Sequence, residues 1–184
     1  MNNEAIIKAC ISGDRKAQHT LYLQLAPMLH SVCKRYLKAE MEIEDALAEA
    51  FVLIFTKMNT LKDAEALFGW AKRVAVNQCL QQLRKKVNFN LSLDDIKHEP
   101  VFEQSTTQQL EHKDLLKLLD YLPDGCRSIF NLFAIEGYSH KEIAVLLQIS
   151  EGTSKSQVNV ARVKLQKLVK QHYDLKNEEN GIAK

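Results

Sequence analysis

The 184-residue chain predicts an all-α fold, in which two small helical domains are joined by a flexible linker. Apolar residues recur at the three- and four-residue spacing of amphipathic helices. Glycine and proline are scarce, at 6 and 3 residues, which disfavours a turn-rich β fold. Helix-capping residues precede several of the apolar runs. Because 46% of the residues are hydrophobic, the chain can bury a core.

The N-terminal domain is expected to span residues 1–86. Its apolar spacing predicts four helices, over about residues 5–12, 15–36, 42–58 and 64–86. Gly13 should end the first helix and Asp14 should cap the second, in which Pro27 marks a kink or a break. On the fourth helix, the spacing of Phe68 and Trp70 predicts that both side chains face the core.

Residues 87–107 are expected to form an acidic linker. They carry a net charge of −3, contain Pro100 and show no apolar periodicity. The blocks before and after them carry +4 and +1. The total of +2 excludes a protein held to DNA by bulk charge alone, but it leaves room for local basic faces.

The C-terminal domain is expected over residues 108–172, followed by a polar tail over 173–184. Within it, residues 139–167 predict two helices joined by a three-residue turn, which is a helix-turn-helix. Ser139 and Glu142 have capping-box spacing, Asp124 is expected to cap the preceding helix, and Gly137 to end it.

The second helix of this hairpin is the candidate DNA reader, because polar side chains near the start of such a helix reach base edges and phosphates. The side chains expected to point outward toward DNA are Thr153, Ser154, Lys155, Ser156, Gln157, Asn159 and Arg162. The amides of Gln157 and Asn159 are suited to adenine. His140, in the first turn of the preceding helix, is expected to be exposed to solvent.

Other protein classes find little support. No phosphate-binding loop, metalloprotease motif or nucleophile motif is present, so we expect no catalytic residues, cofactor or metal. The four cysteines, Cys10, Cys33, Cys79 and Cys126, form no C-x-x-C pair and are interpreted as buried reduced thiols, although Cys10 and Cys33 could meet. The absence of a membrane-spanning run and of signal-peptide order predicts a cytoplasmic protein.

The stretch at residues 136–156, EGYSHKEIAVLLQISEGTSKS, resembles region 4 of bacterial sigma factors, and the N-terminal block resembles region 2. The region 2 resemblance rests on Gly13, Asp14, Ala17, Leu21, Tyr22, Asp45, Glu49, Phe51, Phe68, Trp70, Ala75, Asn77 and Arg84. A short linker between these regions is typical of the extracytoplasmic-function class. The resemblance implies that the protein directs promoter-specific initiation. Its implied partners are core RNA polymerase, through the largest-subunit coiled coil and the flap, promoter DNA and an anti-sigma factor.

The resemblance also implies roles for individual residues. Asp45 and Glu49 match positions at which members of the family bind the polymerase coiled coil. The positions implied to lie at minus-ten DNA are Asn77, Arg84, Lys85 and Lys86, with the loop at residues 59–65 as the specificity loop. Gln148 replaces the family's turn glycine and is therefore expected in the left-handed conformation.

One alternative explains part of the chain. A stand-alone helix-turn-helix regulator would dimerise on a palindromic operator without polymerase. It accounts for residues 139–167 but leaves residues 1–86 without a role.

Overall fold

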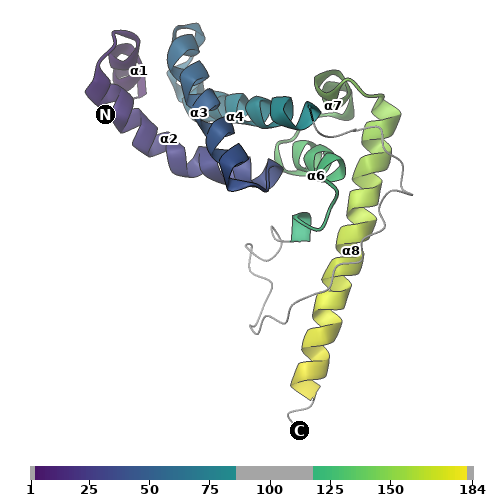
Figure 1. The fold of residues 1–184 in the computed structure, drawn as a ribbon. Helices are drawn as coiled ribbons and strands as arrows, with labels where there is room; N and C mark the ends of the chain where they lie inside the picture. The colour runs from purple at the N-terminus through teal and green to yellow at the C-terminus, as the bar shows by residue number, and fades with distance from the viewer. Residues whose placement is uncertain (1–2, 86–117, 182–184) are drawn as a thin grey trace. The chain divides into compact units, whose positions relative to one another are not determined.

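The computed structural model describes residues 3–85 and 118–181, with side chains up to residue 170, and confirms the predicted all-α fold. Within those ranges every regular element is helical. The chain divides into two compact units, Met1–Lys86 (unit 1) and Val87–Lys184 (unit 2) (Figure 1). The predicted linker, residues 87–107, and the first ten residues of the predicted C-terminal domain, 108–117, lie outside the described residues.

Unit 1 contains the four predicted helices. They are α1 (Asn3–Ile11), α2 (Arg15–Tyr36), α3 (Glu40–Lys57) and α4 (Leu67–Arg84), with short 3-10 turns at η1 (Met58–Thr60) and η2 (Ala64–Ala66). Helices α2, α3 and α4 pack against one another in all three pairs, and α1 packs on α2. The unit is therefore a three-helix core with a short N-terminal helix added to it (Figure 1).

The boundary between α1 and α2 follows the predicted signals. Gly13 adopts a φ of +84°, which a glycine reaches without steric cost. The Asp14 carboxylate accepts hydrogen bonds from the backbone N–H groups of Lys16 (2.8 Å) and Ala17 (3.2 Å), so it caps α2. Pro27 does not divide α2, which remains one helix of 22 residues.

The core of unit 1 corrects one detail of the prediction. On α4 the buried stripe includes Leu67, Ala71 and Ala75, four residues apart. Phe68 and Trp70 lie beside this stripe, so Phe68 is 39% exposed and Trp70 is half-buried. The two aromatic rings were expected in the core, but the buried residues of α4 are aliphatic side chains, Cys79 and Gln78.

Unit 2 is built around one long helix. Its described elements are α6 (Asp124–Phe130), the π-helical turn η4 (Asn131–Ile135), α7 (His140–Leu147) and α8 (Glu151–Gly181). Both α6 and α7 pack against α8. The segment expected as a polar tail is helical as far as Gly181, the last residue of α8.

The start of α6 also differs from expectation. Pro123 occupies the cap position, and Asp124 is the first helical residue. The Asp124 carboxylate accepts a hydrogen bond from Arg127 Nη2 at 3.2 Å, while Asp120 accepts one from Nη1 at 3.0 Å. The Arg127 side chain is only 1% exposed. The Asp124 carboxylate therefore pairs with the buried guanidinium of Arg127 instead of capping α6.

The helix-turn-helix follows the predicted local chemistry closely. Ser139 Oγ accepts a hydrogen bond from Glu142 N at 3.3 Å, and Glu142 Oε2 accepts one from Ser139 N at 2.8 Å, which completes the capping box. Gln148 ends α7 in the left-handed region, with φ 57° and ψ 44°. Ser150 Oγ accepts a hydrogen bond from Thr153 N at 2.9 Å and so caps α8.

Gln148→Gly should stabilise unit 2 by about 0.5–1 kcal/mol, because glycine removes the Cβ strain of the left-handed conformation while adding entropy to the unfolded chain. The measurement is amide hydrogen exchange in α7 under mild denaturant. Gln166→Gly is the same replacement at an exposed site inside α8, and it should lower the stability of unit 2 by a similar amount. A loss of protection in the Gln148→Gly variant would contradict the strain argument.

Candidate polymerase-binding and DNA-binding surfaces

An exposed stripe of acidic and apolar side chains runs along α3. Asp45 and Glu49 are both exposed, four residues apart and therefore on one side of the helix. Met41, one turn earlier, is 75% exposed, and Val52, one turn later, is 61% exposed. We call Met41, Asp45, Glu49 and Val52 the α3 stripe. Large apolar side chains held in water next to carboxylates are typical of a protein-binding surface.

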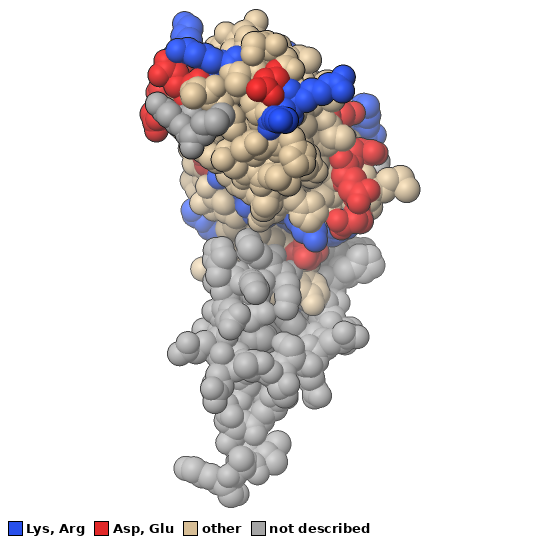
Figure 2. Space-filling view, turned by 90° about the vertical axis from the view of Figure 1, so that its left-hand side faces the viewer, with Lys and Arg blue, Asp and Glu red and all other residues tan. Residues whose placement is uncertain are grey.

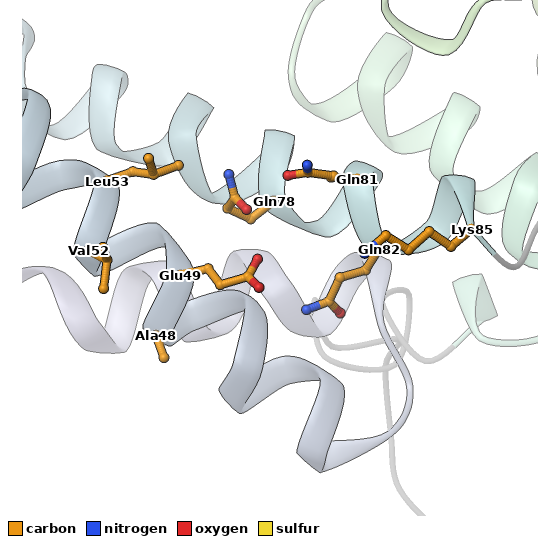
Figure 3. Close-up of a pocket in the computed structure, with 8 residues that line it drawn as sticks. All are labelled: Ala48, Glu49, Val52, Leu53, Gln78, Gln81, Gln82 and Lys85. Atoms are coloured by element: carbon orange, nitrogen blue, oxygen red, sulfur yellow. The ribbon is translucent and has the colours of Figure 1, made fainter.

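A groove of about 500 Å³ lies between α3 and α4, beside the α3 stripe. Its lining residues are Ala48, Glu49, Val52, Leu53, Gln78, Gln81, Gln82 and Lys85 (Figure 3). The groove brings together Glu49, implied to bind polymerase, and Lys85, implied to bind DNA. The two residues come from different helices and belong to one surface.

A second surface follows the outer side of α4. Asn77 and Arg84 are both exposed and lie seven residues apart, so they share a face of the helix. Arg73 is also exposed, one turn before Asn77. Arg73 is not among the residues predicted from the sequence, although its four-residue spacing from Asn77 was a usable signal. We call Arg73, Asn77 and Arg84 the α4 stripe; Lys86 lies outside the described residues.

The implied specificity loop precedes α4 and is held by its own side chains. Thr60 Oγ1 donates a hydrogen bond to the carbonyl oxygen of Lys57 at 2.7 Å. The Asp63 carboxylate accepts one from Glu65 N at 2.9 Å. These local bonds order both ends of the loop through residues 57–65.

The candidate DNA-reading residues divide between two sides of α8. Lys155, Asn159 and Arg162 are exposed at spacings of four and three residues and therefore share a face. Ser156 is exposed beside them. Thr153 and Gln157 are half-buried, and they lie four residues apart on another side of the helix.

Two predictions about the helix-turn-helix are wrong. Ser154 is fully buried, because it begins the buried stripe that continues through Val158 and Ala161. His140 is half-buried instead of exposed, and its ring stacks on Phe133 with 4.4 Å between centroids and 13° between planes. His140 Nδ1 lies 2.9 Å from Ser154 Oγ. Ser154 therefore connects α8 to α7 instead of pointing outward.

Charge on the molecule is mixed in sign. On the face shown in Figure 2, lysine and arginine side chains lie among aspartates and glutamates around a broad uncharged area. This distribution agrees with the small net charge of +2. Among the described residues, no group of three or more His, Cys, Asp or Glu side chains could hold a metal ion. No helix in the described ranges combines the length and apolar character needed to cross a membrane.

The four cysteines are buried and free, as interpreted from the sequence. Cys33 on α2 meets Cys79 on α4, instead of Cys10, and the thiol–thiol hydrogen bond raises the pKa of Cys79. Burial raises the pKa of the Cys126 thiol to about 11. Cys126 donates a hydrogen bond to the carbonyl oxygen of Gln157 at 3.2 Å. The thiols therefore serve packing within each unit.

Each unit contains a match to a family model. Residues 21–88 match "Sigma-70 region 2", and residues 112–165 match "Sigma-70, region 4". The first match covers α3 and α4 with both of their stripes, and the second covers the helix-turn-helix. The α3 and α4 stripes thus fall in one region of the family, and the candidate DNA-reading residues of α8 fall in another.

Relatives and solved structures extend the likeness over most of the chain. The ECF RNA polymerase sigma factor SigM of Mycobacterium tuberculosis H37Rv is 28% identical over 89% of this chain and 83% of its own. The ECF RNA polymerase sigma-E factor of Escherichia coli K12 is 22% identical, over 88% and 91%.

Two solved structures share the fold at a TM-score of 0.51. CnrH, in complex with the cytosolic domain of CnrY, is 19% identical over 93% of this chain and 99% of its own. The sigma factor RpoE of Bartonella quintana, in complex with the anti-sigma factor NepR, is 23% identical over 83% and 96%. With both sigma-70 regions present on one chain, the protein belongs to the sigma-70 family, in its extracytoplasmic-function (ECF) class.

Proposed function

We propose that the protein binds core RNA polymerase and directs promoter-specific initiation of transcription, with unit 1 as the polymerase-binding part. The observation that carries this proposal is the exposed α3 stripe within the region 2 match. Its carboxylates, Asp45 and Glu49, are placed to meet basic side chains of the largest-subunit coiled coil, while Met41 and Val52 bury apolar surface.

The α4 stripe is the proposed minus-ten surface. Arg73 and Arg84 supply positive charge for phosphates, and Asn77 offers an amide that can hydrogen-bond to a base edge. Melting requires a site that holds an unstacked base, and Asn77 together with the loop at residues 59–65 is proposed to provide it. Lys85, on the groove side, and Lys86 are proposed to add phosphate contacts at the end of α4.

Unit 2 is the proposed reader of the minus-thirty-five element, through the N-terminal half of α8. Lys155, Asn159 and Arg162 form the DNA-facing row, with Ser156 beside it. Thr153 and Gln157, which are half-buried on another side of α8, are also proposed to contact DNA. Ser154 is excluded from this set because it is buried. The flap of the polymerase is the proposed binding partner of this unit.

The remaining partners and properties are proposals of the same kind. We propose an anti-sigma factor as the regulator, since the solved RpoE structure is a complex with one. The proposed reaction chemistry belongs to the polymerase, and the chain itself is proposed to catalyse nothing and to need no cofactor. Its proposed place of action is the cytoplasm, where polymerase and promoter DNA are found.

Co-purification with core RNA polymerase tests this function against a stand-alone regulator. The proposal expects a stoichiometric complex with core enzyme and a monomer on gel filtration in its absence. A dimer that binds a palindromic operator and ignores core enzyme would overturn it.

Neutralising the end of α4 should reduce the salt dependence of promoter binding. For Arg84→Gln/Lys85→Gln, the slope of log affinity against log salt should fall by about 1.8, because two phosphate contacts are lost. The measurement uses holoenzyme and a promoter fragment that the wild type selects from a randomised library. Arg15→Gln/Lys16→Gln makes the same chemical change at the start of α2 and should leave the slope unchanged. Equal slopes for wild type and the α4 variant would remove Arg84 and Lys85 from the DNA interface.

A further inference from the structure

Three elements of unit 2 meet at one aromatic ring. Phe133 lies in η4, and the His140 ring, from the first turn of α7, stacks on it with 4.4 Å between centroids. Arg162, from α8, places Cζ over the same ring, 5.6 Å from its centroid. A guanidinium at this distance is attracted by the ring quadrupole. Phe133 therefore contacts the helix before the turn and the helix after it.

The cluster of Phe133, His140 and Arg162 contacts α8 at a second residue, Ser154. His140 Nδ1 lies 2.9 Å from Ser154 Oγ, and Ser154 is fully buried. Ser154 and Arg162 are eight residues apart, or about 12 Å along the helix. The cluster thus fixes both the first turn of α8 and the position of an exposed cation two turns further on.

Arg162 is exposed although its guanidinium is held over a ring. A guanidinium held over a ring can still offer N–H groups to a ligand, and these groups match the two oxygens of a phosphate. An exposed arginine usually loses rotamer freedom when it binds. One that is already held in place loses less, so its contact contributes more to affinity.

We propose that Phe133 and His140 are positioning residues for promoter binding, which hold Arg162 against a DNA phosphate and fix α8 through Ser154. The inference rests on the proposed function of unit 2. It adds two residues that do not touch DNA themselves, and it assigns Arg162 to the DNA backbone, where it carries no base preference.

A double-mutant cycle between Phe133 and Arg162 tests the inference, using holoenzyme and a fragment that the wild type selects from a randomised promoter library. Phe133→Leu should weaken binding about two- to five-fold, the range expected for a lost cation–π contact. Arg162→Ala should lower the salt slope by about 0.9. The double variant should bind clearly more tightly than the sum of the two single effects would give, because the ring acts largely through the arginine.

Replacement of Phe133 by pentafluorophenylalanine separates positioning from packing. This residue keeps the shape of phenylalanine but reverses the ring quadrupole, so promoter binding should weaken while the helical circular dichroism of the protein stays unchanged. Phe133→Tyr keeps an attractive ring and should restore wild-type affinity. Phe130→Leu, one turn earlier, is the matched control, since any effect it has should add to that of Arg162→Ala.

The outcomes separate the inference from the function on which it rests. If wild-type holoenzyme selects no fragment, the proposed function fails. If it selects a fragment but the Phe133 and Arg162 effects add, or the fluorinated ring binds like phenylalanine, the positioning role is overturned.

Discussion

Asp45→Lys/Glu49→Lys should weaken binding to core RNA polymerase by about 100-fold or more, because two carboxylates facing a basic partner become two repelling cations. Both side chains are exposed, so the charge reversal should leave unit 1 folded. The measurement is equilibrium binding of the labelled variant to purified core enzyme. Emission from Trp70, the single tryptophan of the chain, checks that unit 1 remains native.

Glu44→Lys is the control for this change. Glu44 is exposed on the same helix, but it lies about 100° around the axis from Asp45 and outside the α3 stripe. Glu44→Lys should reduce the affinity for core enzyme much less than Asp45→Lys or Glu49→Lys does alone. Core binding that survives the double reversal, or that falls equally with Glu44→Lys, would remove the α3 stripe from the polymerase interface.

Asp120→Asn/Asp124→Asn should destabilise unit 2 by about 3 kcal/mol, because it removes two charged partners of a buried cation. Arg127 is 1% exposed and binds the two carboxylates at 3.0 and 3.2 Å. The aspartates are themselves 59% and 40% exposed, which places the expected cost at the lower end for buried ion pairs. Urea unfolding followed by circular dichroism measures it.

The two units provide an internal reference. Trp70 lies in unit 1, so its fluorescence transition should not move when unit 2 is weakened. Glu4→Gln removes an exposed pair, Lys8 with Glu4 at 3.2 Å, and should cost less than about 0.5 kcal/mol. A double variant at residues 120 and 124 that unfolds at the wild-type urea concentration would show that Arg127 does not depend on its carboxylates.

Local chemistry made most of the fold predictable. Gly13, Asp14, the Ser139–Glu142 capping box and Ser150 each mark a helix end through bonds to nearby backbone groups, and the structure confirms all of them. Such signals need no knowledge of distant packing. The left-handed Gln148 followed from the resemblance, because the family has a glycine at this turn position.

The errors occur where tertiary contacts decide. Ser154 and His140 are polar, so the sequence favoured solvent for both, but each satisfies the other across the α7–α8 crossing. Asp124 had the chemistry of a cap, yet Arg127 recruits it. Phe68 was placed in the core by spacing alone, although aliphatic side chains make up most of the buried face of α4. A pairing of distant residues leaves no local signal in one sequence.

Run-off transcription with purified core RNA polymerase tests directly whether the protein directs promoter-specific initiation. The template is a library of fragments from the source genome, and core enzyme alone is the reference. We expect defined start sites that require this protein and share two spaced elements upstream. These start sites should disappear with Asp45→Lys/Glu49→Lys. Transcripts that are the same with and without the protein would contradict this role in initiation.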